Sequence, residues 1–187
     1  MTEPNQNNGT TRAYDVSALV VLLVEPNDNM RALVRSILGS FGIERITESR
    51  TGADALGHLA TRTVDVVITG LVMEPMNGDE LIRRIRQADG PEKFLPLITL
   101  SGHADRAHVA AARDAGATDF LAKPVRPRDV YAHLVRIIED RRPFVRTHSY
   151  FGPDRRRGGA AKFDGPDRRR AVATTAAKET TSEPESS

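Results

Sequence analysis

Short apolar runs alternate with amphipathic stretches between residues 15 and 142 of the chain. The apolar runs are rich in Val, Ile and Leu and are too short for helices, so they are predicted to be buried strands. They lie at residues 18–24, 44–49, 64–69, 95–101 and 118–123. The amphipathic stretches repeat their apolar residues at helical spacing, which predicts helices at residues 28–42, 53–62, 78–88, 104–116 and 126–141.

This alternation of strand and helix predicts an α/β fold, because parallel strands need crossover connections and helices supply them. Right-handed crossovers favour a doubly wound, five-stranded parallel sheet of the flavodoxin-like type, with strand order 2-1-3-4-5. In such a sheet a functional site is expected at the carboxyl ends of the strands.

The two ends of the chain lack this periodicity. Residues 1–14 are polar and are expected to form a disordered arm before a domain that spans residues 15–142. Residues 143–171 are rich in Arg, Gly and Pro, and residues 172–187 are expected to be a disordered tail. Because the apolar pattern ends near Arg142, we expect residues beyond it to add almost nothing to the stability of the domain.

Composition excludes several classes of function. The 187 residues include no cysteine, which excludes disulfides, thiolate catalysis and cysteine-ligated zinc. No metal site or cofactor is predicted, because the histidines lack ligand spacing and are expected to be solvated or to cap helices. They are His58, His103, His108, His133 and His148. The longest apolar run is too short to cross a membrane, and a cytoplasmic protein is expected.

Charge is distributed unevenly along the chain. Residues 141–170 hold ten of the 27 Lys and Arg but three of the 25 Asp and Glu, so this segment carries +7 and the remainder −5. A basic segment attached to an acidic domain predicts an anionic partner for that segment.

Four stretches at the predicted strand ends resemble the response-regulator receiver domain, the family of the chemotaxis regulator CheY. They read VLLVEPNDN, DVVITGLVMEPMNG, LITLSGHAD and GATDFLAKPV, within a resemblance that covers about residues 17–140. By this resemblance, a working receiver has an acceptor aspartate after the third strand and a magnesium-binding acidic pair after the first. It also has a hydroxyl after the fourth strand, matched by Ser101, and a lysine after the fifth, matched by Lys123.

The acceptor and the acidic pair are both altered. Gly70 stands at the acceptor position and has no side chain to carry a phosphoryl group. Glu25 matches the first acid, but Pro26 replaces the second, which leaves one carboxylate for a cation that takes several oxygen ligands. The domain is therefore predicted to be a pseudo-receiver without enzymatic activity. In it, Lys123 is expected to pair with Glu25, and Ser101 to bond locally.

Two nearby acids keep an alternative open. In this alternative the protein is a phosphorelay regulator with a non-standard acceptor. The acceptor would be Glu74, in the loop after the third strand, or Asp28, just past Glu25. Neither lies at the acceptor position, so the pseudo-receiver is favoured. Phe120 stands at the aromatic switch position of the family and is expected to pack.

The basic segment contains one sequence motif twice, which we call the repeated phrase. YFGPDRRR begins at Tyr150 and FDGPDRRR begins at Phe163, each with an aromatic residue first and three arginines last. Gly and Pro fix an extended turn, arginine forks bind phosphate or the O6 and N7 atoms of guanine, and aspartate accepts from the guanine N1–H and amine. An aromatic ring adds a stacking face. One copy is therefore expected to hold one guanine beside one phosphate.

Two copies suit cyclic di-GMP, a two-fold symmetric molecule with two guanines and two phosphates. Residues 146–170 also resemble the arginine-rich segment of CheY-like cyclic-di-GMP effectors, receiver-fold proteins associated with the bacterial flagellar motor. The predicted binding residues are Tyr150, Gly152, Pro153, Asp154, Arg155, Arg156, Arg157, Phe163, Gly165, Pro166, Asp167, Arg168, Arg169 and Arg170.

These features predict an adaptor that binds cyclic di-GMP and passes the signal to a protein partner, for which the resemblance implies a flagellar-motor protein. The alternative is a pseudo-receiver whose basic segment binds nucleic acid without selectivity. An aspartate before each arginine run weakens binding to a polyanion, which favours the nucleotide.

Overall fold

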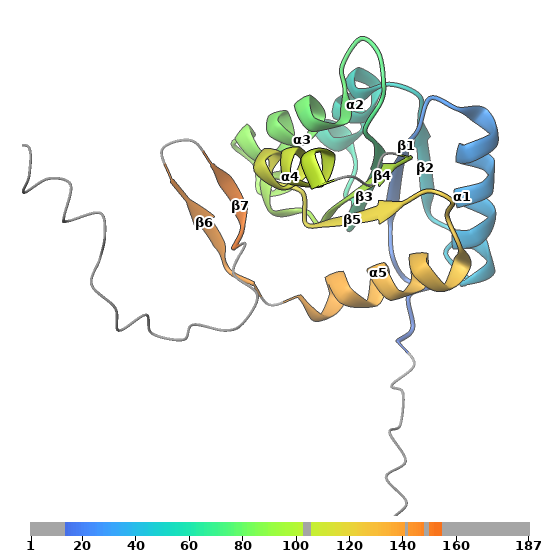
Figure 1. Cartoon of the computed structure of the whole chain (residues 1–187). Helices are drawn as coiled ribbons and strands as arrows, with labels where there is room; N and C mark the ends of the chain where they lie inside the picture. The colour runs from blue at the N-terminus through green and yellow to red at the C-terminus, as the bar shows by residue number, and fades with distance from the viewer. Residues whose placement is uncertain (1–13, 103–105, 141, 148–149, 155–187) are drawn as a thin grey trace, which may run out of the picture. The chain divides into compact units, whose positions relative to one another are not determined.

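The predicted sheet is present in the computed structural model, which describes residues 14–102, 106–140, 142–147 and 150–154 (Figure 1). Its five strands are parallel and lie in the order β2-β1-β3-β4-β5, which confirms the fold expected from the sequence. They are β1 (Val21–Val24), β2 (Ile46–Ser49), β3 (Val66–Gly70), β4 (Leu97–Ser101) and β5 (Asp119–Ala122).

A helix fills each crossover, and one more follows β5. These helices are α1 (Asp28–Ser40), α2 (Gly52–Thr61), α3 (Gly78–Gln87), α4 (Arg106–Ala115) and α5 (Pro127–Glu139), with a 3-10 turn, η1 (Pro91–Phe94), before β4. Three of them begin after a polar residue, Asn27, Thr51 or Asn77, whose side chain accepts a backbone N–H of the first turn. In the described part of the chain, no helix combines the length and hydrophobicity that a membrane span requires.

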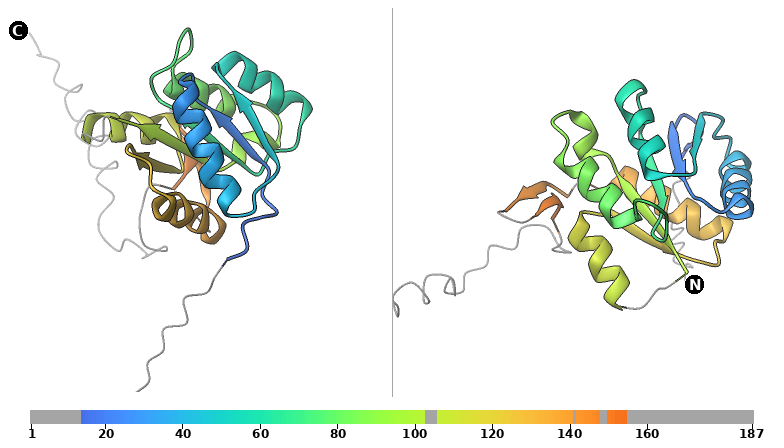
Figure 2. Two further views of the ribbon diagram at one scale, coloured as in Figure 1. Left: turned by 90° about the vertical axis from the view of Figure 1, so that its right-hand side faces the viewer. Right: turned by 90° about the horizontal axis from the view of Figure 1, so that it is seen from above.

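The helices cover both faces of the sheet (Figure 2). On one face, Leu23 of β1 packs in a cluster with Leu38 of α1 and Leu134 of α5. On the other face, Leu22 packs in a second cluster with Leu81 of α3 and with residues of α2 and α4. Because both faces are buried, the strands are continuously apolar rather than alternating, as the sequence predicted.

A hairpin that the sequence did not predict follows α5. Strands β6 (Phe144–Arg146) and β7 (Phe151–Pro153) pair antiparallel, with Phe144 opposite Pro153. The rings of Phe144 and Phe151 meet the ring of Phe94 edge-on, with centroids 5.3 and 5.6 Å from it. The domain therefore continues to Asp154 rather than ending near Arg142, because aromatic side chains in short strands bury area that no periodicity reveals.

The hairpin covers Arg86 of α3, which is 2% exposed. The Phe144 ring lies 5.0 Å from its guanidinium carbon, and the guanidinium donates to four neutral oxygen atoms. These are the carbonyl oxygens of Gly116, Lys93 and Leu95, at 2.9, 2.7 and 2.7 Å, and the hydroxyl of Thr118, at 3.3 Å. Burial lowers the pKa of Arg86 to about 9, so the group still carries its charge at neutral pH.

Gly116 makes this close packing possible. Its φ of +109° favours glycine, and a Cβ there would lie 2.9 Å from the Arg86 Cγ and 2.9 Å from the Phe151 carbonyl oxygen. A side chain at position 116 would therefore displace β7 from α3.

Candidate functional site

Four predicted site residues meet at the carboxyl edge of the sheet. Glu25 directly follows β1, Gly70 ends β3, Ser101 ends β4 and Lys123 directly follows β5. Strand pairing places Ser101 beside Ala122, the last residue of β5. Parallel strands end at the same edge, so residues far apart in the chain become neighbours there.

Glu25 and Lys123 form an ion pair, as the sequence predicted. The Lys123 Nζ lies 2.9 Å from the Glu25 Oε2, and the backbone N–H of Asn27 donates to the other carboxylate oxygen over 3.1 Å. The side chain of Glu25 is 4% exposed and that of Lys123 is 25% exposed. Both carboxylate oxygens of Glu25 thus accept hydrogen bonds within the protein, and the Glu25 carboxylate balances the positive charge of Lys123.

The Glu25 carboxylate lies in the space that a side chain at position 70 would enter. A Cβ on Gly70 would be 3.1 Å from the Glu25 Oε2, the same oxygen that Lys123 contacts. The loop after β3 returns closely over this point, because a Cβ on Gly78 would come within 2.3 Å of the Gly70 carbonyl oxygen. An acidic side chain at position 70 would therefore compete with Glu25 for the lysine.

The remaining acids near the strand ends do not add to this site. Asp28 pairs with Arg31 and, at 3.1 Å, with Arg50, and the hydrogen bond from Arg31 lowers the pKa of its carboxyl group. Pro26 and Glu74 are exposed. Among the described residues, no group of three or more His, Asp or Glu is placed to hold a metal ion.

Ser101 and Phe120 are placed within the packed domain. Ser101 is buried, and its carbonyl oxygen accepts the Lys123 backbone N–H over 2.8 Å. Phe120 is half-buried against the core cluster shared by α2, α3 and α4, in agreement with the expected packing role.

His133 differs from the expectation of a solvated or capping histidine. Its Nδ1 lies 2.6 Å from the Asp119 Oδ2, and Arg136 donates to the same oxygen over 2.9 Å. Helical spacing on α5 brings both basic residues to the start of β5, a contact that the linear spacing of histidines and acids did not reveal. His103 and His148 lie outside the described residues.

Part of the first copy of the repeated phrase belongs to the packed hairpin. Gly152 and Pro153 are buried, and the hydroxyl of Tyr150 donates to the Pro153 carbonyl oxygen over 2.8 Å. A Cβ on Gly152 would meet the Tyr150 hydroxyl oxygen at 2.5 Å and the Gly116 Cα at 3.1 Å. Asp154 ends this part, with its N–H donating to the Pro143 carbonyl oxygen over 2.9 Å.

The rest of the repeated phrase lies outside the described residues. This applies to Arg155, Arg156 and Arg157 of the first copy and to all predicted binding residues of the second, Phe163, Gly165, Pro166, Asp167, Arg168, Arg169 and Arg170. Their role in binding stays a prediction.

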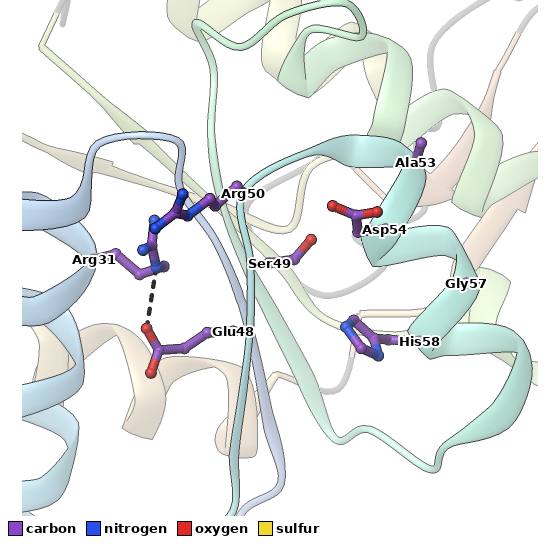
Figure 3. A pocket seen from close by; sticks show the side chains of 8 residues that line it. All are labelled: Arg31, Glu48, Ser49, Arg50, Ala53, Asp54, Gly57 and His58. Atoms are coloured by element: carbon purple, nitrogen blue, oxygen red, sulfur yellow. Dashed lines mark hydrogen bonds and ion pairs between the residues drawn. The ribbon is translucent and has the colours of Figure 1, made fainter.

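A pocket of about 620 Å³ lies on another part of the domain, between α1, β2 and α2 (Figure 3). Arg31 at its wall donates to Glu48 over 3.1 Å, and Arg50 pairs with Asp28. No predicted site residue lines this pocket, and its two arginines are already paired with carboxylates. We therefore assign no ligand to it.

Comparison with known proteins agrees with the fold. Residues 21–135, more than half of the chain, match the response regulator receiver domain, and the chain belongs to that family. Chemotaxis protein CheY1 of Helicobacter pylori is 31% identical over 109 residues, which cover 58% of this chain and 87% of that protein. Chemotaxis protein CheY-3 of Vibrio cholerae is 30% identical over 119 residues, covering 64% of this chain and 91% of that protein.

Solved structures give the same result. The chemotaxis protein CheY4 of Vibrio cholerae matches with a TM-score of 0.60 at 27% identity, over 64% of this chain and 99% of that chain. The receiver domain of the sensor histidine kinase PA1611 of Pseudomonas aeruginosa, with a magnesium ion coordinated in its active site cleft, matches with a TM-score of 0.60 at 25% identity. That match covers 65% of this chain and 98% of the other. The family match ends at residue 135, before the hairpin and the repeated phrase.

Proposed function

We propose that this receiver-family chain is a non-enzymatic signalling adaptor that no longer accepts phosphate. In this proposal it binds cyclic di-GMP through its repeated GPDRRR phrase and passes that signal to a protein partner, with a flagellar-motor protein as the candidate. In this proposal it acts in the cytoplasm.

The geometry at the strand ends supports the loss of phosphate transfer. Gly70 offers no oxygen to phosphorylate, and Pro26 leaves Glu25 as the one acid of the pair. The Glu25 carboxylate is bonded to Lys123 at 2.9 Å and to the Asn27 N–H. A magnesium ion would have to compete with both contacts, and it would gain one carboxylate where it needs several oxygen ligands.

The observation that carries the nucleotide proposal is the recurrence of Gly-Pro-Asp-Arg-Arg-Arg in two copies that begin with different residues. In the first copy, packing accounts for Gly152, whose Cβ would meet the Gly116 Cα at 3.1 Å, and for Pro153, which is buried. The second copy has Asp164 where the first has Phe151, and Phe163 lacks the hydroxyl with which Tyr150 bonds.

The two copies therefore share Gly-Pro-Asp-Arg-Arg-Arg but not the aromatic residues that pack the first copy. A shared packing role does not explain why Gly-Pro-Asp-Arg-Arg-Arg recurs, whereas a shared ligand does. Asp and Arg together match the two hydrogen-bonding edges of guanine, and the other arginines match its phosphate.

The experiment is a titration of the full chain with cyclic di-GMP by calorimetry. If each copy binds one guanine, Asp154→Ala and Asp167→Ala should each weaken binding by roughly 1 to 3 kcal/mol, the size of a lost specific base contact. Asp164→Ala is the matched control, because it removes the same charge at a position where the first copy has Phe151, outside the shared Gly-Pro-Asp-Arg-Arg-Arg, and it should leave binding unchanged.

The opposite result identifies a nonspecific basic segment. Loss of any of the three acids raises the positive charge, so binding to a polyanion such as DNA should tighten in all three variants. Tightening of this kind, or no binding of cyclic di-GMP at tens of micromolar concentration, would overturn the proposal.

Membership of the receiver family supports a second candidate, a phosphorelay regulator with a non-standard acceptor such as Glu74. Acetyl phosphate with Mg²⁺ separates the two. We expect the intact mass to stay unchanged, whereas a stable gain of about 80 Da, the mass of one phosphoryl group, would support the second candidate.

A further inference from the structure

The hairpin covers the buried Arg86 with an aromatic ring rather than with a carboxylate. The Arg86 guanidinium donates to four neutral oxygen atoms, all outside the hairpin, and the Phe144 ring of β6 lies over it at 5.0 Å. An aromatic face offsets part of the cost of removing water from a cation. Docking of the hairpin therefore combines favourable aromatic contacts with an unfavourable desolvation of charge.

The hairpin is also short. Strands β6 and β7 have three residues each, and an isolated two-stranded hairpin is marginally stable in water. It is held to the domain by the rings of Phe144 and Phe151, which meet Phe94, and by the approach of β7 to Gly116. Such a segment can detach while the sheet and its helices stay folded, because local opening costs less free energy than global unfolding.

The same residues serve the docked hairpin and the repeated phrase. Gly152 and Pro153 are buried, so a ligand cannot reach them while β7 is docked. The Tyr150 hydroxyl donates to the Pro153 carbonyl oxygen, and the Asp154 N–H donates to the Pro143 carbonyl oxygen. The first copy therefore cannot present Gly152 and Pro153 to a nucleotide and pack against the domain at the same time.

We propose that the hairpin is an autoinhibitory latch: its docking on Arg86 and Phe94 excludes cyclic di-GMP from the first copy, and binding of the nucleotide there releases it. This inference rests on the proposed function and deepens it, because it names the conformational change that carries the signal. Release uncovers Arg86 of α3 and the part of Phe94 that the hairpin covers, a surface that the docked hairpin withholds from a protein partner.

Competition between docking and binding fixes the sign of the effect of docking mutations. If only the released hairpin binds, the apparent affinity is the intrinsic affinity multiplied by the fraction of chains in which the hairpin is released. A substitution that weakens docking raises this fraction, so it tightens binding although it changes no residue of the phrase. A hairpin that binds the nucleotide while docked predicts weaker binding in the same variants.

The test is calorimetric titration of the full chain and of two docking variants with cyclic di-GMP. Phe144→Ala removes the ring over Arg86, and Gly116→Ala places a Cβ 2.9 Å from the Phe151 carbonyl oxygen. Each should tighten binding by on the order of tenfold, the factor that the loss of one aromatic contact gives. Phe144→Tyr keeps the ring and should bind about as tightly as the parent chain.

Phe41→Ala is the matched control. The Phe41 ring packs edge-on against Tyr131, with centroids 5.6 Å apart, and both residues belong to the core cluster on the other face of the sheet from α3. This truncation lowers the stability of the domain without touching the hairpin. Its affinity for cyclic di-GMP should therefore equal that of the parent chain.

Hydrogen exchange gives a second readout that needs no variant. Saturating cyclic di-GMP should speed the exchange of the amides of β6, which lies outside the phrase, while the amides of the central strands β1 and β3 keep their protection. A docked hairpin that holds the nucleotide predicts greater protection of β6 instead.

Three results would overturn the latch. Unchanged or weaker binding in Phe144→Ala and Gly116→Ala would show that docking does not exclude the nucleotide. Equal tightening in Phe41→Ala would assign the effect to general destabilisation, and greater protection of β6 would show that the hairpin stays docked. In each case Asp167→Ala would still weaken binding if the proposed function holds, whereas a parent chain that binds no cyclic di-GMP would refute the proposed function and the latch together.

Discussion

Replacing Phe144 by Ala should destabilise the domain through the hairpin. The ring stacks on the buried Arg86 guanidinium at 5.0 Å and contacts the rings of Phe94 and Phe151. A fully buried Phe→Ala change costs about 3 to 5 kcal/mol, and the half-burial of Phe144 reduces this to about 2. The lost cation–π contact adds about 1 kcal/mol, so we expect a total loss of about 2 to 3 kcal/mol.

The assay is equilibrium unfolding in urea. With a denaturant slope of about 2 kcal/mol per molar, typical of small domains, this loss lowers the midpoint by roughly 1 to 1.5 M. Val72→Ala is the control: Val72 is 75% exposed in the loop after β3, and its truncation should change stability by less than about 0.5 kcal/mol.

A chain that ends after Arg142 extends the test. It removes the whole hairpin, so its loss of stability sets the largest loss that detachment of the hairpin can cause. We therefore expect this chain to be at least as destabilised as Phe144→Ala. Midpoints equal to that of the full chain in both cases would refute the reasoning and return the end of the domain to Arg142.

One further prediction concerns the carboxyl ends of the strands, and another concerns Asp119 at the start of β5. Gly70→Asp alone should not restore phosphorylation by acetyl phosphate. Its carboxylate would approach Glu25 and compete for Lys123, and Pro26 would still leave the magnesium-binding pair one acid short. A gain of one phosphoryl group in the intact mass would contradict this. Burial alone would raise the pKa of Asp119, but the hydrogen bond from His133 and the charge of Arg136 bring it below the ordinary value of 3.8. The folding stability that this lowered pKa supplies is present above about pH 4 and is lost as the pH falls further. His133→Gln should therefore make the thermal midpoint fall less steeply between pH 5 and about 2. An unchanged fall would show that His133 does not stabilise the Asp119 carboxylate.

Much of the fold could be predicted from the sequence because its elements repeat local patterns. Buried parallel strands are continuously apolar and the helices are amphipathic, so the strand order and the edge that carries Glu25, Gly70, Ser101 and Lys123 followed from periodicity and the rules of parallel sheets. The Glu25–Lys123 pair was predicted because the resemblance to receivers marks both residues, and both directly follow strands that end at this edge.

The hairpin and the packing of its aromatic rings against Phe94 were decided by the tertiary structure alone. Strands β6 and β7 have three residues each, and β7 contains Gly and Pro, so no periodicity marks them. Both strands pack against Arg86 and Phe94, fifty or more residues earlier in the chain, and a glycine at position 116 lets β7 approach α3. Local sequence shows which face of an element is buried, whereas contacts between distant side chains form only once the chain has folded. These contacts anchor residues 150–154 of the first copy to the domain.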